Sequence, residues 1–198
     1  MDRRHLLQAI TAIAAGPLLL AACGERKPQF NAVDLTGADY AKDFQLPDTD
    51  GKVRRLQDFK GKAVIVFFGY TQCPDVCPTT MADIAQAKKL LGQEGAKVQG
   101  IFITIDPERD TPELLKAYVA NFGPDFIALR GTPEQTAAVA KDFKVYYKKV
   151  EGKAPGSYTM DHSAASYIYD PEGHLRLYAR YGAGPQVLAD DLKQLLQA

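Results

Sequence analysis

The chain has 198 residues, with 24 basic and 24 acidic side chains and a formal net charge of zero. That length is sufficient for one domain with a substantial core, and 46% apolar and 24% charged residues are typical of a globular protein. Proteins that bind polyanions carry a basic excess. The balanced charge therefore excludes a general polyanion binder, and we expect no nucleic-acid partner.

The first 22 residues have the features of a secretory signal. Two arginines, Arg3 and Arg4, form a positive region, and an apolar run with small residues follows from Leu6 to Ala22. The run leads into Cys23 through Leu-Ala-Ala, which resembles the cleavage box of bacterial lipoproteins. We expect residues 1–22 to be removed, Cys23 to carry a lipid anchor, and the mature chain to lie at the periplasmic face of a bacterial membrane. An uncleaved anchor or a plain signal peptide is the alternative.

Residues 23–42 are expected to form a flexible tether, and residues 43–198 the folded domain. The segment from Gly24 to Lys42 is polar, contains Gly and Pro, and has no sustained periodicity. Beyond it, two short apolar segments flank the turn-type cluster Asp48–Gly51, which predicts a small β-hairpin.

The rest of the domain alternates between predicted strands and helices. The run 63–69 is continuously apolar and rich in β-branched and aromatic residues, which predicts a strand buried on both faces. Prolines mark the helix starts, where a missing N–H costs nothing. In chain order, we expect strands at 63–69, 98–105, 126–129, 145–150, 164–169 and 175–181, and helices at 78–91, 112–122, 133–143 and 185–196. This order predicts an α/β fold with a central mixed sheet flanked by helices.

Two cysteines four positions apart, Cys73 and Cys77, lie where a buried strand meets a helix N-terminus. The helix dipole and the unpaired N–H groups there favour a thiolate, so both sulfurs should be nucleophilic and able to bind a soft metal. Three interpretations compete: a structural disulfide, a redox dithiol and a metal site. The disulfide is the weakest, because so short a loop restrains little of the unfolded chain.

Histidine is the obvious third ligand for such a site. After signal removal, His162 and His174 remain. His174 lies in a Pro-Glu-Gly turn and is expected to be solvated, whereas His162 directly precedes a predicted strand. Two thiolates alone suit linear Cu(I), and an added imidazole gives a site for Cu(I) or Cu(II). A structural zinc site would need a fourth ligand.

Three motifs together resemble the Sco/SenC family of copper chaperones for cytochrome c oxidase assembly. They are Cys-Pro-Asp-Val-Cys-Pro at 73–78, Asp-Pro-Glu-Arg-Asp-Thr-Pro at 106–112, and Asp-His-Ser at 161–163. The resemblance extends from about Phe44 to the C-terminus. It implies a thioredoxin-like fold and one copper ion per chain, Cu(I) or Cu(II), bound by Cys73, Cys77 and His162.

Asp106 ends the second buried strand and is therefore expected at the same sheet edge as the cysteines. One interpretation is that it orients the site from outside the ligand set. The other is that it caps its own loop, while Arg109 and Asp110 form a local ion pair.

Two functions follow from the resemblance. The first is a binding protein, not an enzyme, that delivers copper to the binuclear centre on the copper-bearing subunit of cytochrome c oxidase, after loading by another periplasmic copper donor. The second is a thiol-disulfide oxidoreductase that uses the redox pair Cys73–Cys77 to reduce the cysteines of that centre. The spacing of four, instead of the three of thioredoxin-type motifs, favours the first.

Overall fold

The computed structural model describes residues 28–197, so the predicted signal peptide and Cys23 lie outside the described residues. The strands are β1 Val33–Asp34, β2 Leu46–Pro47, β3 Val53–Arg54, β4 Ala63–Gly69, β5 Val98–Thr104, β6 Ile127–Leu129, β7 Tyr147–Glu151, β8 Tyr158–His162, β9 Ser166–Tyr169 and β10 Leu175–Ala179. The α-helices are α1 Val76–Leu90, α2 Pro112–Ala120, α3 Pro133–Asp142 and α4 Pro185–Gln197.

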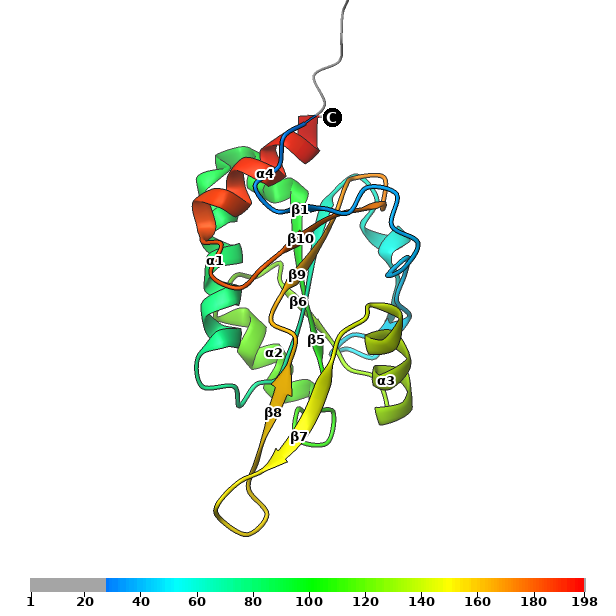
Figure 1. The fold of residues 1–198 in the computed structure, drawn as a ribbon, viewed down its shortest axis with the longest axis vertical. Helices are drawn as coiled ribbons and strands as arrows, with labels where there is room; N and C mark the ends of the chain where they lie inside the picture. The colour runs from blue at the N-terminus through cyan, green and yellow to red at the C-terminus, as the bar shows by residue number, and fades with distance from the viewer. Residues whose placement is uncertain (1–27, 198) are drawn as a thin grey trace, which may run out of the picture.

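Within residues 28–197, a six-stranded sheet in the order β1-β10-β9-β4-β5-β6 forms the centre of the domain. Strands β4, β5 and β6 are parallel, whereas β9 and β10 are antiparallel to their neighbours. Helices α1, α2 and α4 lie on one side of this sheet and α3 on the other (Figure 1). The predicted mixed sheet flanked by helices is therefore confirmed.

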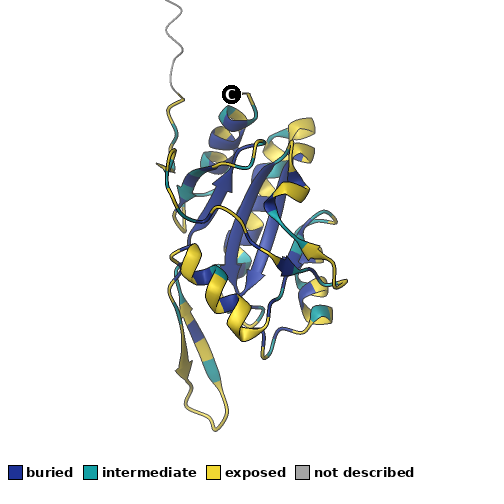
Figure 2. Cartoon of the chain, turned by 90° about the vertical axis from the view of Figure 1, so that its right-hand side faces the viewer, coloured by how far each residue is buried: buried dark blue, intermediate teal, exposed yellow. Residues whose placement is uncertain are grey.

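The core lies on both faces of the central strands. Every residue of β4 and β5 is buried, because helices cover both sides of a parallel sheet. Figure 2 shows these strands in the buried colour, with exposed residues on the outer faces of the helices. The continuous apolar runs of the sequence thus correspond to the middle of the sheet.

Helix starts follow the predicted chemistry at two places. The side chain of Thr111 accepts a hydrogen bond from the Leu114 N–H at the start of α2, and Thr132 does the same for Gln135 at the start of α3. In each case proline occupies a first-turn position.

The predicted tether is wrong for its described part, residues 28–42. Strand β1 pairs with β10 at the edge of the main sheet. Just before it, the backbone N–H groups of Asn31 and Ala32 each donate to the Asp191 carboxylate of α4 at 2.8 Å. Ala41 is fully buried. A two-residue edge strand is too short to produce a periodic pattern, so it could not be predicted from the sequence.

Two further elements differ from the prediction near the motifs. Helix α1 begins at Val76 instead of Pro78, which places Cys77 in its first turn. Strand β8 has no counterpart in the prediction and pairs with β7 in a separate two-stranded sheet. His162 is therefore the last residue of β8 and not a loop residue before β9. Within residues 28–197, no helix is both long enough and apolar enough to cross a membrane.

Candidate metal centre

The cysteine loop leaves the C-terminal end of β4 and enters α1. Gly69, the last residue of β4, permits this arrangement, since a Cβ there would lie 2.8 Å from the Cys77 sulfur and 2.9 Å from the Phe102 ring. Cys77 is fully buried and Cys73 is partly exposed. The loop therefore presents one sulfur to solvent and holds the other against the core.

Three donor atoms from distant parts of the chain converge at this loop. The sulfurs of Cys73 and Cys77 and a ring nitrogen of His162 all lie within 4.8 Å of one another. Nε2 of His162 is 3.6 Å from the Cys77 sulfur, and the Cys77 backbone N–H donates to the Cys73 sulfur at 3.4 Å. Cys73 and Cys77, the cysteines in the described part of the chain, are free thiols with no disulfide between them.

The two thiols differ strongly in acidity. A hydrogen bond from the Cys77 side chain, followed by the backbone N–H groups of Cys77 and Asp75 at the start of α1, lowers the pKa of Cys73 to about 5. The pKa of Cys77 is raised, first by the proton it shares with Cys73 and then by burial. At neutral pH the pair consequently holds one proton, with the negative charge on the more exposed sulfur.

His162 is oriented by its backbone and by two aromatic rings. Its Nδ1 lies 2.9 Å from the carbonyl oxygen of Ser163. Because a carbonyl can only accept, Nδ1 carries the hydrogen of this bond, so Nε2, which faces Cys77, is the nitrogen that a neutral ring would offer to a metal. The rings of Phe67 and Tyr70 pack edge-on against the imidazole, each with its centroid 6.1 Å away.

Comparison with known proteins assigns the chain to a family. The family-wide sequence profile of SCO1/SenC matches residues 33–197. The chain belongs to the SCO1/SenC family. A "SCO2-like protein" of Rickettsia felis is 32% identical over 191 residues, covering 95% of this chain and 93% of its own length.

Solved structures of Sco proteins share the fold. ScoI of Bradyrhizobium japonicum, solved with copper bound, is 42% identical, with a TM-score of 0.70 over 77% of this chain and 97% of that one. Apo Sco1 of Thermus thermophilus is 36% identical, with a TM-score of 0.75 over 84% of this chain and 97% of that one. The predicted family and thioredoxin-like fold are confirmed.

The donor set of this Sco/SenC protein suits copper. Because the three donor atoms lie within 4.8 Å of one another, a single ion placed between them could contact all three. Thiolate sulfur and imidazole nitrogen are the ligand types that copper prefers. The site therefore fits a single copper ion.

The second histidine is separate from the cluster. The side chain of His174 is 75% exposed and lies 3.5 Å from the Asp170 carboxylate at the β9–β10 turn. The prediction of a solvated turn residue is confirmed.

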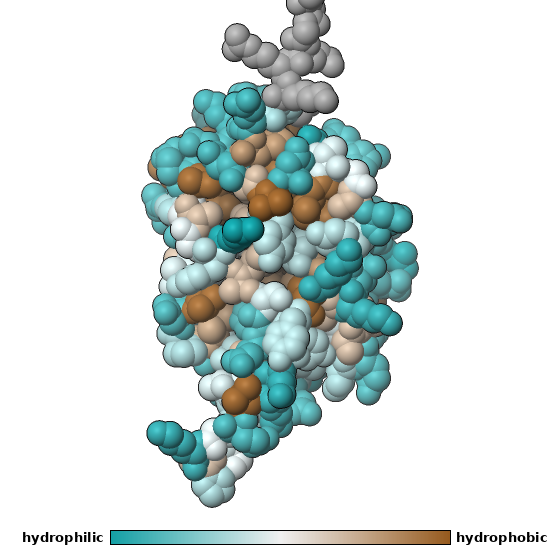
Figure 3. All heavy atoms as spheres, viewed as in Figure 1, coloured by the Kyte–Doolittle hydropathy of each residue, from teal (hydrophilic) through white to brown (hydrophobic). Residues whose placement is uncertain are grey.

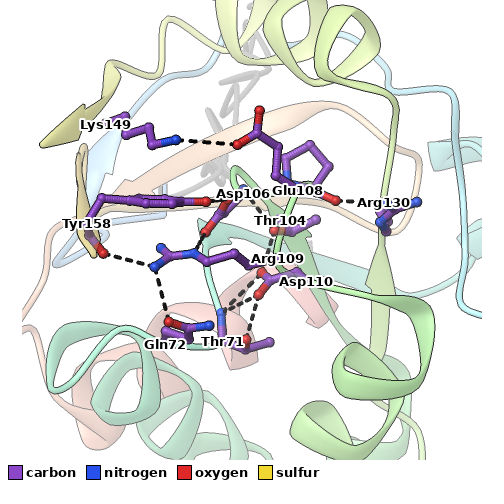
Figure 4. Close-up of polar contacts among 11 residues, drawn as sticks. Thr71, Gln72, Thr104, Asp106, Glu108, Arg109, Asp110, Arg130, Lys149 and Tyr158 are labelled. Atoms are coloured by element: carbon purple, nitrogen blue, oxygen red, sulfur yellow. Dashed lines mark hydrogen bonds and ion pairs between the residues drawn. The ribbon is translucent and has the colours of Figure 1, made fainter. Parts of the chain in front are cut away.

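The carboxylate of Asp106 binds one residue of its own loop and one residue of the β7–β8 hairpin. Its Oδ2 accepts from Arg109 Nε at 2.5 Å, and its Oδ1 accepts from the Tyr158 hydroxyl at 2.8 Å (Figure 4). Among the described contacts, none joins it to the cysteines or to His162. The prediction of an ion pair between Arg109 and Asp110 is wrong, since Arg109 pairs with Asp106.

Asp110 is the acidic group that reaches the cysteine loop, and the sequence did not reveal it. It is fully buried and accepts from the Thr71 hydroxyl at 2.5 Å, the Thr71 N–H at 3.1 Å and the Thr104 hydroxyl at 2.6 Å. Burial raises the pKa of Asp110. These bonds hold the start of the loop to the end of β5. The position of Asp110 directly before the N-cap Thr111 could have predicted a turn, but not the burial of the Asp110 side chain.

Proposed function

We propose that this protein is a copper chaperone in which Cys73, Cys77 and His162 bind one copper ion and pass it to the copper-bearing subunit of cytochrome c oxidase. The observation that supports this most directly is the convergence of two sulfurs and one imidazole nitrogen within 4.8 Å. The copper-bound structure of a Sco relative that is 42% identical adds support.

The different protonation and exposure of the two thiols indicate an order for ligand exchange at this site. Cys73 is already deprotonated at neutral pH, whereas Cys77 must lose a proton when copper binds. Three ligands leave a coordination position open to an incoming donor. Because Cys73 is the more exposed sulfur, a partner's ligand meets it first, and we expect release to begin there. The buried Cys77 would then be the last to dissociate.

We further propose that the domain acts at the periplasmic face of a bacterial membrane, held there by a lipid on Cys23. The cleavage box before Cys23 supports this, and two acyl chains on one residue anchor a protein stably. A donor in the same compartment would supply the copper.

Copper stoichiometry of the reduced and the oxidised full chain tests the copper-binding part of the proposal. Reduced protein should bind one copper ion after dialysis. Oxidised protein, Cys73→Ser and Cys77→Ser should each retain close to none, because a disulfide sulfur is a poor ligand and loss of one thiolate leaves a single sulfur for the soft ion. Full occupancy in either serine variant would mean that copper binds elsewhere.

A second function, thiol-disulfide exchange, is favoured by the unequal acidity of the two cysteines. An exposed thiolate beside a buried thiol is the arrangement expected of an attacking and a resolving cysteine. The Cys73 thiolate would attack a partner disulfide, and Cys77 would then displace the partner's sulfur. The chain would lose two electrons and form the Cys73–Cys77 disulfide, and the partner would leave as a dithiol.

A further inference from the structure

The strand that carries His162 is not part of the main sheet. In the described part of the chain, β8 pairs with β7 alone, and this hairpin projects from the body (Figure 1). Its side chains are mostly exposed, and its projecting end is largely hydrophilic (Figure 3). The hairpin therefore has little apolar surface to hold it to the domain, and β9 restrains it only from Ser166 onward. Apart from the packing of His162 against Phe67 and Tyr70, its orientation depends on polar contacts.

Arg109 makes polar contacts with both the hairpin and the cysteine loop. Its Nη1 donates to the Tyr158 carbonyl at 2.9 Å and to the Gln72 side-chain oxygen at 3.1 Å (Figure 4). Tyr158 begins β8, and Gln72 directly precedes Cys73. One guanidinium group thus joins the two segments that carry the three donor atoms.

Aromatic contacts strengthen the same connection. The guanidinium carbon lies 3.5 Å from the ring centroid of Tyr158 and 5.7 Å from that of Tyr70. Tyr70 in turn packs against His162. Stacking on a ring together with several directed N–H bonds is a combination that arginine offers and lysine does not.

Asp106 keeps Arg109 in place. The Arg109 side chain is 19% exposed and that of Asp106 is 3% exposed, so their ion pair is largely desolvated. The Tyr158 hydroxyl donates to the other oxygen of Asp106. The three residues form a closed triangle in which each contacts the other two, and such a network favours one arrangement of the hairpin over others.

We propose that Arg109 is a positioning residue that holds the β7–β8 hairpin against the cysteine loop and so keeps His162 at the copper site. This rests on the proposed copper function. When the contact is lost, His162 is no longer held over the sulfurs, while Cys73 and Cys77 remain in place. The binding of Cu(II), which favours nitrogen more than Cu(I) does, is then weakened most.

The test loads the reduced full chain with Cu(II) or Cu(I) and compares Arg109→Met with the unaltered protein. Three properties are measured: the thiolate-to-copper absorption band, the nitrogen hyperfine coupling in the electron paramagnetic resonance spectrum, and the rate of copper loss to a chelator. We expect weakened nitrogen coupling and Cu(II) loss faster by about tenfold or more, the range seen when an outer partner of a metal-binding histidine is removed. Cu(I) stoichiometry should stay at one per chain, held by the two sulfurs.

Matched variants separate positioning from charge and from folding. Arg109→Lys keeps the charge but not the planar fork, so it should behave like Arg109→Met; full rescue by lysine would overturn the proposal. Arg130→Met is the control, since Arg130 bonds the Pro107 carbonyl in the same loop and should leave copper properties unchanged. Gln72→Leu removes one bond at an exposed position and should shift the spectrum in the same direction without unfolding the chain.

Two negative results have different meanings. If His162→Ala alters the copper spectrum while Arg109→Met and Gln72→Leu both match the unaltered protein, the positioning role is overturned. Should Arg109→Met fail to fold, Gln72→Leu alone decides, and an unchanged spectrum and loss rate again overturn it. Absence of copper binding in the unaltered protein would instead overturn the proposed function itself.

Discussion

The sulfur of Cys77 lies 3.6 Å from Nε2 of His162, although 85 positions separate the two residues in the chain. Cys77 is in the first turn of α1, and His162 ends a strand of a separate hairpin. The cysteine loop and the first turn of α1 supply one sulfur each, and the hairpin supplies a nitrogen whose position depends on other contacts. This division suggests that the cysteines and the histidine can be tested separately.

Replacement of His162 by alanine should distinguish copper delivery from thiol-disulfide exchange. The variant loses a proposed copper ligand, but the Cys73–Cys77 pair should still cycle between dithiol and disulfide, because the Cys77 side chain and the N–H groups at the start of α1 support the thiolate more than His162 does. If delivery is the function, oxidase activity in a strain carrying His162→Ala falls and added copper partly restores it. Normal oxidase assembly in that strain under copper limitation would favour the oxidoreductase.

The lowered pKa of Cys73 predicts its reactivity at acidic pH. A thiol with an ordinary pKa of about 8.5 is almost entirely protonated at about pH 6, whereas Cys73, with a pKa of about 5, is mostly thiolate there. Metal-free protein should therefore be alkylated by iodoacetamide at Cys73 at that pH, and the rate should fall as the pH drops through about 5. Peptide mass analysis identifies the modified residue.

The matched variant for this measurement is Cys77→Ala. Because the Cys77 side chain is the largest cause of the low pKa of Cys73, its removal should move the midpoint of the alkylation profile to higher pH. Preferential labelling of Cys77 at about pH 6 would contradict the assigned order of acidity.

Gly69→Ala should damage the metal site by displacing Cys77. The new Cβ would lie 2.8 Å from the Cys77 sulfur, and overpacking of this kind costs about 1–3 kcal/mol of stability. We expect a lower melting temperature together with weaker copper binding, measured by calorimetry and chelator competition.

Gly131→Ala is the control for the Gly69 variant. Its Cβ would lie 2.8 Å from Leu46 Cδ2, which is an equally close approach away from the cysteines. It should reduce stability to a similar extent and leave copper affinity unchanged. Equal loss of copper binding in both variants would show that the effect comes from general destabilisation.

Replacement of Cys23 by serine should release the protein from membranes. Without the thiol no lipid can be attached, and the chain should move to the soluble fraction, as judged by fractionation and immunoblotting. The unaltered protein should fractionate with membranes and incorporate radioactive fatty acid, whereas the Cys23→Ser variant should incorporate none. Unaltered protein found in the soluble periplasmic fraction would exclude lipid anchoring.

Several parts of this protein could be predicted from the sequence because their causes are local. The run 63–69 is apolar throughout and therefore predicts a strand covered on both faces. Threonine followed by proline at 111–112 and 132–133 satisfies helix-end requirements within a few residues. The place of the cysteines between strand and helix predicts acidic thiols for the same local reason. This prediction holds for Cys73 and is wrong for Cys77, whose pKa is raised by its hydrogen bond to Cys73 and by burial.

Other features were decided by tertiary structure, since their causes lie far along the chain. The burial of strand β8 alternates, but over only five positions with Met160 alone buried, and its partner β7 is largely exposed, so the segment is too short and too polar to predict a strand. The edge strand β1 depends on β10 and on the Asp191 carboxylate, more than 140 positions away. Asp110 is buried because Thr71 and Thr104 satisfy it, and Arg109 turns toward Asp106 because Tyr158 provides a ring and a carbonyl. A charged side chain pairs with a group of opposite charge that the fold brings within about 4 Å. The spacing of residues in the sequence does not show which groups the fold brings together.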